Sequence, residues 1–443
     1  MPIWNNILET CILPISDILT GSIYFKNLKQ LRKIQHYSQK ELEILQKNKL
    51  MEILTHATKY IDFYKEQSLN SDDPYVELKK FPIMYKDTIK NNLSSLVLNN
   101  DYSQLIEQKS SGSSGIQSSV FMSKHELSRT QSIQTLWWEW AGYRYGNKIL
   151  QTGMTLNRGF IKKIKDILLS TTYVSAFQLD EKTILKILQE LEKKPKEHMG
   201  GYASSIYLFA KIAKDNNLKD IHFDSIFSWG DKMFPHYRKL IEEQFHTKVF
   251  DTYGSTEGLM IASQCNKGSY HIMSPHIYLE ILDEEGNDVK DGEIGYVVVT
   301  RLDAFHMPLI RYYLGDLAVK ADKNEMCSCG MKLPLLKKVI GRDTDIVKTS
   351  SGKYMIVHFF TAIFEYIPEI KQFQIVQKHL NGIDILYIPA KNFNEKILNT
   401  IKKQILEYLN EIFEINFIEV HKIEATASGK PQIIKSFLEK NKI

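Results

Sequence analysis

One stretch of the chain, residues 224–258, constrains the fold more than any other: "DSIFSWGDKMFPHYRKLIEEQFHTKVFDTYGSTEG". It predicts a strand from Ser225 to Trp229, a turn at Gly230, a helix that opens near Pro235 and a second strand over 248–253. A strand, a helix and a strand in this order form a βαβ unit with parallel strands. We therefore expect an α/β sheet in which the loops after both strands emerge at one carboxyl edge, where open sheets of this kind bind ligands.

The loop after the second strand, "YGSTEG", combines groups that suit a nucleotide. Gly254 lets a ligand approach the backbone, and a flat ring could stack on Tyr253. The carboxylate of Glu257 could hold a hard cation such as magnesium beside phosphates. The alternative is a polar turn with a solvated glutamate.

A Ser/Gly tract, "QKSSGSSGIQ" at 108–117, is either a flexible linker or a phosphate-binding loop. Ser123 and Glu126 form a capping-box pattern that predicts a helix to about Ala141. Since "SQLIEQK" ahead of the tract can be a short strand, strand, loop and helix would follow one another as in a phosphate-cradling turn. The lysine of the usual P-loop is missing, because Ile116 follows Gly115.

Composition excludes several function classes. The 57 basic and 52 acidic residues form no dense basic stripe, so the footprint of a nucleic-acid binder is missing. No apolar run reaches the roughly 18 residues that a bilayer span needs, and the first residues lack the pattern of a signal peptide. We expect a cytoplasmic globular protein, and 443 residues are enough for two or more domains.

The second half of the chain predicts a β region and then a separate small domain. "GYVVVTRL" is a strong strand, and Asp316 in "RYYLGD" suits a carboxylate that accepts two ribose hydroxyls. Arg342 could contact a sugar or a phosphate, or form an ion pair. Beyond about residue 344 a hairpin, a helix with one apolar face over 397–412 and a closing strand predict an α+β domain. Its last turn, "ATASGK", contains Lys430. A lysine so close to the end of the sequence is most often simply solvated.

In this order, "SSGSSG", "YGSTEG", "RYYLGD", "GRDTDIVK" and "TASGK" resemble the core motifs of the adenylate-forming superfamily of acyl-CoA synthetases, luciferases and adenylation domains. "GYASSIYLFA", "SWGDKMFPHYRKLIEEQF", "HMPLIRYYLGD" and "CSCG" are most similar to its phenylacetate-CoA ligase branch, which includes proteins encoded with capsular polysaccharide genes. The chain departs from the family at two places. Ile116 and Gln117 stand where a residue and a proline are common, and Thr344 stands where the hinge is usually aspartate or lysine.

The resemblance implies a fold with α/β and α+β parts: a large N-terminal domain, 1–343, with βαβ-containing sheets and a β subdomain, and a small mobile C-terminal domain, 344–443. It implies ATP-dependent activation of a carboxylic acid, aryl or small acyl, to an acyl-AMP, followed by transfer to a thiol such as coenzyme A. The nucleotide-binding residues would be Ser111, Gly112, Ser113, Ser114 and Gly115 for the β- and γ-phosphates, Gly230, Asp251, Tyr253 and Gly254 for adenine, and Asp316 and Arg342 for the ribose.

The resemblance also implies the catalytic groups. Thr256 would contact the α-phosphate, Glu257 would hold magnesium, and Lys430 would bridge the acid and the α-phosphate in the transition state. The small domain would then turn about Thr344 to admit the thiol acceptor. Other interpretations stay open: the acyl group could pass to an amine, a sugar or a carrier protein, or the chain could bind nucleotide without turnover. The oligomeric state is also open, a dimer being one option.

Four soft side chains predict a metal site. Cys265 and His271 are spaced CxxxxxH, and Cys327 and Cys329 follow as CxC, so two loops supply four ligands. Four such ligands make a closed tetrahedral site, which is typical of structural zinc. The alternative is a set of reduced core cysteines beside an ordinary strand histidine.

Overall fold

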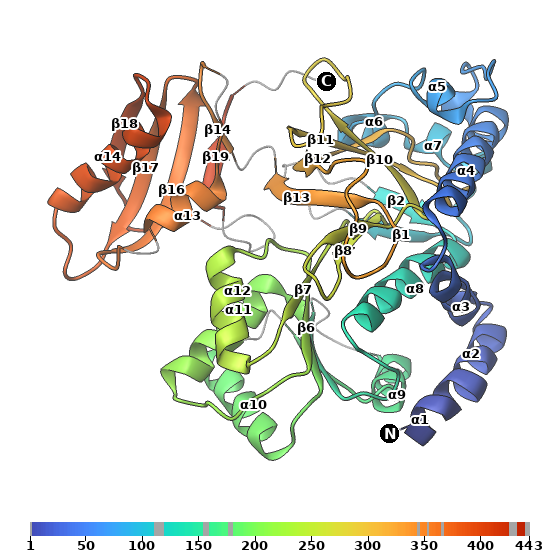
Figure 1. Ribbon diagram of the computed structural model, residues 1–443, viewed down its shortest axis with the longest axis horizontal. Helices are drawn as coiled ribbons and strands as arrows, with labels where there is room; N and C mark the ends of the chain where they lie inside the picture. Colours follow the sequence, from blue (N-terminus) through green and yellow to red (C-terminus); the bar gives the residue numbers. More distant parts are fainter. Residues whose placement is uncertain are drawn as a thin grey trace.

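An 11-stranded sheet forms the centre of the molecule (Figure 1). The computed structural model describes residues 2–109, 119–153, 159–175, 180–342, 346–351, 354–364, 367–424 and 432–438. The strands of this sheet are β3 (Ile149–Gly153), β4 (Thr171–Ser175), β5 (His198–Tyr202), β6 (Ser225–Trp229), β7 (Val249–Gly254), β8 (Met260–Gln264), β9 (Tyr270–Ile272), β10 (Ile277–Leu282), β11 (Ile294–Arg301), β12 (Tyr312–Lys320) and β13 (Leu335–Arg342). Their order is β10-β11-β12-β13-β9-β8-β7-β6-β5-β3-β4.

The sheet changes character at β7. From β4 to β7 neighbouring strands are parallel, and from β7 to β10 they are antiparallel. The predicted βαβ unit is confirmed as β6, α12 (Pro235–Phe245) and β7, with Phe227 opposite Phe250 in parallel register. The helix begins at its proline because the fixed φ of that residue suits the first helical position. The strand before "YGSTEG" is therefore the seam between the two halves.

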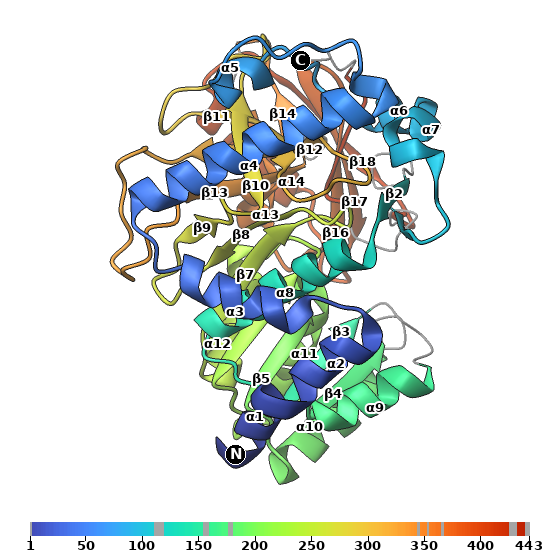
Figure 2. The ribbon, with the colours of Figure 1, turned by 90° about the vertical axis from the view of Figure 1, so that its right-hand side faces the viewer.

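Helices cover the sheet: those up to α8 precede it in the chain, and the later ones connect its parallel strands. They are α1 (Pro2–Ile7), the π-helix η1 (Leu8–Ile12), α2 (Leu13–Thr20), α3 (Tyr24–Ile34), α4 (Gln39–Tyr60), α5 (Pro74–Leu78), α6 (Lys86–Asn91), α7 (Leu93–Leu96), α8 (Lys124–Trp140), α9 (Phe160–Leu168), α10 (Glu181–Lys193) and α11 (Ala203–Asp215). Figure 2 shows α4 lying across the antiparallel half. Among the helices of the described residues, none combines the length and the apolar character that crossing a bilayer requires.

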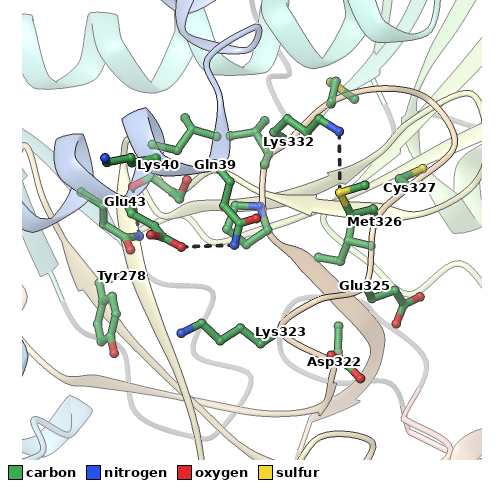
Figure 3. Close-up of a pocket in the computed structure, with 18 of the residues that line it drawn as sticks. Gln39, Lys40, Glu43, Tyr278, Asp322, Lys323, Glu325, Met326, Cys327 and Lys332 are labelled. Atoms are coloured by element: carbon green, nitrogen blue, oxygen red, sulfur yellow. Dashed lines mark hydrogen bonds between the residues drawn. The ribbon is translucent and has the colours of Figure 1, made fainter.

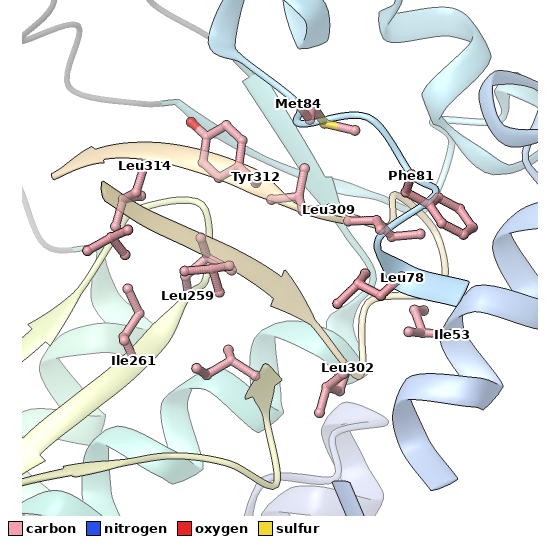
Figure 4. Close-up of a cluster of buried hydrophobic side chains, with 14 of the residues drawn as sticks. Ile53, Leu78, Phe81, Met84, Leu259, Ile261, Leu302, Leu309, Tyr312 and Leu314 are labelled. Carbon is pink, nitrogen blue, oxygen red and sulfur yellow. The ribbon is translucent and has the colours of Figure 1, made fainter. Parts of the chain in front are cut away.

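The largest hydrophobic core fills the space between α4 and the antiparallel half of the sheet (Figure 4). Ile53 comes from α4, Phe81 from the segment after α5, Leu259 from the loop just before β8 and Tyr312 from β12, and each is almost fully buried. Burying a side chain of this size stabilises the fold by roughly 1.5–3 kcal/mol. Because Leu259 directly follows "YGSTEG" and Tyr312 belongs to "RYYLGD", this core fixes the backbone at both motifs.

The Ser/Gly tract connects two strands rather than a strand and a helix. β1 (Ile106–Lys109) pairs antiparallel with β2 (Ser119–Met122), and Lys109 lies opposite Ser119. The prediction that the helix follows the tract directly is therefore wrong, because the short "SVFM" segment buries Val120 and Met122 and pairs as a strand. The capping box at the start of α8 is confirmed, with the Ser123 amide donating to Glu126 Oε2 at 2.6 Å. The tract itself, 110–118, lies outside the described residues.

The C-terminal part has its own sheet and its own core. Its elements are β14 (Ile346–Lys348), β15 (Tyr354–Ile356), α13 (Val357–Phe364), β16 (Ile370–His379), β17 (Gly382–Pro389), α14 (Lys396–Leu409), β18 (Glu414–Glu419) and β19 (Ile434–Ser436), and the four-stranded sheet has the order β18-β17-β16-β19. The predicted hairpin is confirmed, with Ile375 opposite Ile385. The predicted fold class, α/β followed by a small α+β part, is also confirmed. Ile412 was expected on the buried helix face, but α14 ends at Leu409 and Ile412 is fully exposed.

Candidate active site

The two predicted nucleotide loops lie side by side at one edge of the sheet. β6 and β7 are parallel neighbours with Ser228 opposite Asp251, so the turn at Gly230 and the loop that starts at Gly254 leave the sheet at adjacent carboxyl ends. This placement follows from the βαβ connection, which returns the chain to the same edge. Figure 1 shows this edge next to β13, the strand that leads toward the C-terminal sheet.

Asp316, the predicted ribose carboxylate, is buried and has two fixed partners. The Tyr253 hydroxyl donates to its Oδ2 at 2.8 Å, and Arg342 Nε lies 3.1 Å from its Oδ1. Asp316 and Arg342 face each other across β12 and β13, and Arg342 Nη1 also donates to the Leu314 carbonyl at 2.9 Å. Burial and the nearby carboxylate raise the pKa of Tyr253 well above its usual value, so its hydroxyl stays a donor. Arg342 therefore forms an ion pair with the carboxylate that was predicted to bind the ribose.

Asp251, predicted beside adenine, is held inside the sheet. The hydroxyls of Ser228 and Tyr270 donate to its two carboxylate oxygens, and its amide donates to Gln264 Oε1 at 3.1 Å. Burial raises the pKa of this carboxyl, although the two hydroxyl donors oppose the shift. Asp251 thus links three strands, and its contact with adenine stays a prediction.

The loop after β6 is fixed by contacts that the sequence did not reveal. Gly230 has a φ of 78°, and a Cβ atom there would lie 2.5 Å from the ring of Tyr202, so the close approach requires glycine. Asp231 accepts hydrogen bonds from the first two backbone amides of α11 at 2.5 and 3.1 Å. The ammonium of Lys232 donates to the Ile340 carbonyl of β13. The loop is thereby tied to α11 on one side and to β13 on the other.

Glu257 is a buried carboxylate, 3% exposed, whose partners are hydroxyls. Tyr312 Oη donates to its Oε1 at 3.1 Å, and Thr256 Oγ1 lies 3.4 Å from its Oε2. No cationic side chain of the described residues forms an ion pair with it. The Ser255 hydroxyl in the same loop is buried and has no hydrogen-bond partner within the described part of the chain. A buried carboxylate of this kind fits a hard cation, since charge in the interior is costly unless it is compensated.

A buried charge network supports this loop from behind. His276 Nε2 lies 3.0 Å from the Gly258 carbonyl, and its Nδ1 lies 2.7 Å from Asp303 Oδ2. Arg301 Nε donates to Asp303 Oδ1 at 3.0 Å. Burial alone would raise the pKa of Asp303, but His276 and Arg301 hold it well below its usual range. Gly258 has a φ of 79°, and a Cβ atom there would lie 2.6 Å from the Met122 side chain, so β2 packs directly against the loop.

Seven predicted site residues lie outside the described residues: Ser111, Gly112, Ser113, Ser114, Gly115, Thr344 and Lys430. Their described neighbours show where the chain enters and leaves two of these segments. β2, which follows the tract, contacts the loop of Glu257 through Met122, and β13 ends at Arg342, two residues before Thr344. Their roles stay predictions.

The four predicted metal ligands come together. Cys265 Sγ and Cys327 Sγ lie 3.6 Å apart, Cys329 Sγ lies 3.3 Å from His271 Nε2, and all four ligand atoms lie within 4.8 Å of one another. In a tetrahedral zinc site with bonds of about 2.3 Å to sulfur and about 2.0 Å to nitrogen, the ligand atoms are roughly 3.5–3.8 Å apart. His271 Nδ1 lies 3.3 Å from the Leu333 carbonyl, which leaves Nε2 for the metal. The residues therefore fit zinc, and the predicted cluster is confirmed as a cluster.

A cavity of about 670 Å³ lies beside this cluster (Figure 3). Its walls are the first half of α4 and the segment 321–335, and Figure 3 shows Lys40, Tyr278 and Lys323 around it. Cys327 lines the cavity and also belongs to the metal cluster. None of the described residues predicted to bind the nucleotide lines this cavity. The cavity is therefore separate from the predicted nucleotide site around the loops after β6 and β7, which we call the strand-edge site.

Comparison with known proteins gives similarity over most of the chain. The CapK C-terminal domain family matches residues 347–437. Protein CapK of Staphylococcus aureus is 24% identical over 425 residues, which cover 92% of this chain and 91% of CapK. A phenylacetate-coenzyme A ligase of Thermus thermophilus is 30% identical over 154 residues, which cover 33% of this chain and 34% of that ligase.

The fold is shared with solved structures. 2-Hydroxyisobutyryl-CoA ligase, in the postadenylation state in complex with R3-HIB-AMP, superimposes with a TM-score of 0.67 at 17% identity, covering 88% of both chains. At this identity the similarity is one of fold.

Proposed function

We propose that this chain, a member of the adenylate-forming superfamily in its phenylacetate-CoA ligase-like branch, activates a carboxylic acid with ATP and then transfers the acyl group to a thiol such as coenzyme A. In the first step a carboxylate oxygen of the acid bonds to the α-phosphorus, and the bond from that phosphorus to the bridging oxygen breaks, so pyrophosphate leaves with the electron pair. In the second step the thiol sulfur bonds to the acyl carbon and AMP leaves. No protein nucleophile is needed, so the enzyme acts by alignment and charge compensation.

The observation that carries the proposal is the presence of two buried carboxylates, Asp316 and Glu257, at the loop after β7. Asp316 is held by Tyr253 and Arg342, which suits a fixed acceptor for ribose hydroxyls. Glu257 is buried with only hydroxyl partners among the described residues, which suits a magnesium ligand. Magnesium, when bound, would neutralise phosphate charge. Thr256 would then contact the α-phosphate, and the tract at 111–115 would hold the other two phosphates.

The remaining residues follow the superfamily assignment. Tyr253, Gly254, Asp251 and the turn at Gly230 would surround adenine. Lys430 would bring its ammonium between the acid and the α-phosphate, carried by a small domain, 344–443, that turns about Thr344 on the large domain, 1–343. These roles rest on the order of the motifs in the chain.

An aryl acid fits the edge of the parallel half best. Trp138 stacks on Phe227 with ring centroids 5.5 Å apart and on Trp229 at 5.8 Å, and Tyr202 lies opposite Trp229 in the register of β5 and β6. The side chains of Tyr202 and Trp229 are half-buried and stand at the carboxyl ends of their strands. The Trp138 indole N–H is buried without a hydrogen-bond partner among the described residues, so a polar group of a ligand could satisfy it.

The direct test is acid-dependent exchange of labelled pyrophosphate into ATP with a panel of aryl and short aliphatic acids. The proposal expects exchange with at least one aryl acid that depends on magnesium and needs no coenzyme A. Release of AMP should then rise when coenzyme A is added. Binding of ATP without exchange for any acid of the panel would instead favour a nucleotide-binding protein without turnover.

A second acceptor class stays open, because the match extends over 91% of CapK but over only 34% of the phenylacetate-coenzyme A ligase of Thermus thermophilus. In this alternative the acyl-adenylate passes to an amine, a sugar or a carrier protein. Supplying coenzyme A, amines, amino sugars and carrier proteins in turn, and measuring free AMP, separates the two. Stimulation by one of the other acceptors but not by coenzyme A would contradict transfer to coenzyme A and leave adenylation intact.

Zinc is proposed for the cluster of Cys265, His271, Cys327 and Cys329, with a structural role. The backbone amides of Lys267 and Cys329 lie 3.4 and 3.5 Å from cysteine sulfurs, as expected of donors that stabilise metal-bound thiolates. Reduced thiolates at a metal also suit a cytoplasmic protein. Elemental analysis of the untagged protein should find about one zinc per chain.

A further inference from the structure

Exposed apolar side chains gather on one face of the molecule. The described residues include 20 large hydrophobic side chains that are exposed, and nine of these lie in α1, α2 and α9. Figure 2 shows the three helices on the same face, below α3 and α4. Patches of clustered apolar side chains on a soluble domain mark interaction surfaces, whereas scattered ones do not. We call the exposed apolar side chains of these three helices the apolar face.

Helix α9 presents one apolar edge to solvent. Phe160 is 78% exposed and Ile167 is 79% exposed, and Ile164 lies between them at helical spacing with 42%. These positions, i, i+4 and i+7, share one side of a helix. Lys162 and Lys163 are also exposed and flank this edge. An amphipathic helix with large apolar side chains on one side and lysines beside them is the pattern of a helix that lies in the interface of a bilayer.

Helix α2 also presents large apolar side chains to solvent, although it carries no lysine or arginine. Ile18 and Leu19 are each 80% exposed, and Ile15 is 52% exposed on the same side. The segment 2–20 has two half-buried carboxylates, and both accept hydrogen bonds from α3. Glu9 receives two hydrogen bonds from Arg32, at 3.0 and 2.7 Å. The carboxylate of Asp17 accepts from the first amides of α3, at 2.8 and 3.1 Å.

The two parts of the apolar face are joined. The Trp4 indole in α1 donates to the Leu168 carbonyl at the end of α9, at 3.2 Å. Asn5 Nδ2 donates to the Tyr145 carbonyl at 2.8 Å, which fixes α1 on the body of the protein. α1 leads directly through η1 into α2. The face is therefore held by the fold rather than formed by a loose terminal arm.

We propose that the apolar face docks on the surface of an anionic lipid bilayer, with α2 and α9 lying in the interface. Side chains such as Ile18 and Ile167 would insert between acyl chains, while Lys162 and Lys163 would meet the lipid phosphates. Charge decides between this partner and a second copy of the chain. A symmetric contact through α9 would bring the lysines of both copies into one interface, where like charges repel. The proposal is independent of the acid, of the acceptor and of the proposed reaction.

Cosedimentation of the full chain with vesicles tests the proposal. We expect binding to vesicles of phosphatidylcholine with 30–40% phosphatidylglycerol, at least about tenfold weaker binding to phosphatidylcholine alone, and weakening by salt. Ile18→Glu and Ile167→Glu should each reduce the partition coefficient at least about tenfold. Ile412→Glu is the matched control, because Ile412 is fully exposed on the C-terminal domain and lies outside the apolar face. It should bind vesicles as the unchanged chain does.

Two further measurements keep the test decisive. Thermal unfolding and pyrophosphate exchange in the absence of lipid should be unchanged in all three variants, since none of the three side chains belongs to the strand-edge site. Light scattering should show the same molar mass for the unchanged chain and for Ile18→Glu. The proposal would be overturned if the unchanged chain did not bind anionic vesicles, or if the Ile18→Glu and Ile167→Glu variants bound them as strongly as the unchanged chain does. A dimer of the unchanged chain that Ile18→Glu dissociates would overturn it as well. If the unchanged chain showed no pyrophosphate exchange, the proposed reaction would be contradicted, and the result on lipid binding would still hold.

Discussion

Replacing Glu257 with glutamine separates a metal ligand from a structural carboxylate. Glutamine keeps the shape of the side chain and can still accept from Tyr312, which now donates at 3.1 Å. It removes one negative charge that is 3% exposed and has no ion-pair partner among the described residues. Losing one preorganised charge contact at a transition state costs about 3–4 kcal/mol, which is roughly a hundredfold to a thousandfold in rate. We expect magnesium-dependent pyrophosphate exchange to fall by this factor while ATP binding stays measurable.

The thermal stability of the Glu257→Gln variant should rise or stay unchanged, although its exchange rate falls. Without a metal, a buried carboxylate that has only hydroxyl partners is costly to desolvate, so a neutral amide should leave the thermal midpoint unchanged or raise it. Glu280→Gln is the matched control, because Glu280 is equally buried but lies 3.2 and 3.1 Å from Arg311 nitrogens. Breaking that pair leaves a buried guanidinium without its counter-ion and should cost about 3 kcal/mol.

Exchange kinetics and thermal unfolding, measured on both variants without added metal, make the comparison. A Glu257→Gln variant that exchanges pyrophosphate at the normal rate would remove Glu257 from the reaction. A midpoint that falls as far as that of Glu280→Gln would assign Glu257 a structural role. Either result would refute the reasoning while leaving the fold unaffected.

Three other predictions concern separate parts of the molecule. Lys430→Ala should nearly abolish pyrophosphate exchange but still convert a synthetic acyl-AMP with the right acceptor; exchange at the normal rate would make "ATASGK" an ordinary turn. Cys329→Ser should lower the zinc content well below one per chain and lower the thermal midpoint, and unchanged metal content in plasma emission analysis would contradict the cluster as its site. The hydrogen bond that the His306 ring donates to the Glu126 carboxylate raises the pKa of His306. The protonated ring therefore stabilises the fold below the ordinary histidine pKa of about 6.5, and this contribution is lost as pH rises through the raised value. The thermal midpoint of His306→Asn should therefore lie below that of the unchanged chain at pH 5.5 and approach it at pH 9; a constant difference would contradict the pairing.

The sequence predicts the site best where function and local geometry coincide. Glycines at a strand end, as in "YGSTEG", signal a turn and a ligand at the same time, and the βαβ spacing then places Gly230 beside that loop. The metal cluster could be predicted because cysteine and histidine are rare enough for four of them in two loops to be informative. The order of the motifs predicted the superfamily, and the chain is similar in sequence to CapK and to a phenylacetate-coenzyme A ligase and shares its fold with a CoA ligase.

Contacts between distant segments could not be predicted in the same way. Nothing near Arg301 in the sequence indicates that it reaches the carbonyl of Glu126, or that His276 supports Gly258. The strand after the Ser/Gly tract was missed because four residues carry too little periodicity, and only pairing with β1 makes them a strand. The position of Ile412 was predicted wrongly because the apolar spacing of the helix continues in the sequence to this residue. The helix itself ends earlier, at Leu409, where Asn410 adopts a left-handed φ of 49°.

The position of Arg342 at the very end of β13 has a consequence for engineering. The ion pair with Asp316 belongs to the large sheet, yet β14 of the C-terminal part begins as early as Ile346. A chimera that takes its C-terminal domain from a relative should therefore be joined after Arg342. With a junction within β13, the residue at position 342 would come from the relative while Asp316 stayed. Such a junction would also disturb the Ile340 carbonyl, which accepts a hydrogen bond from the Lys232 ammonium.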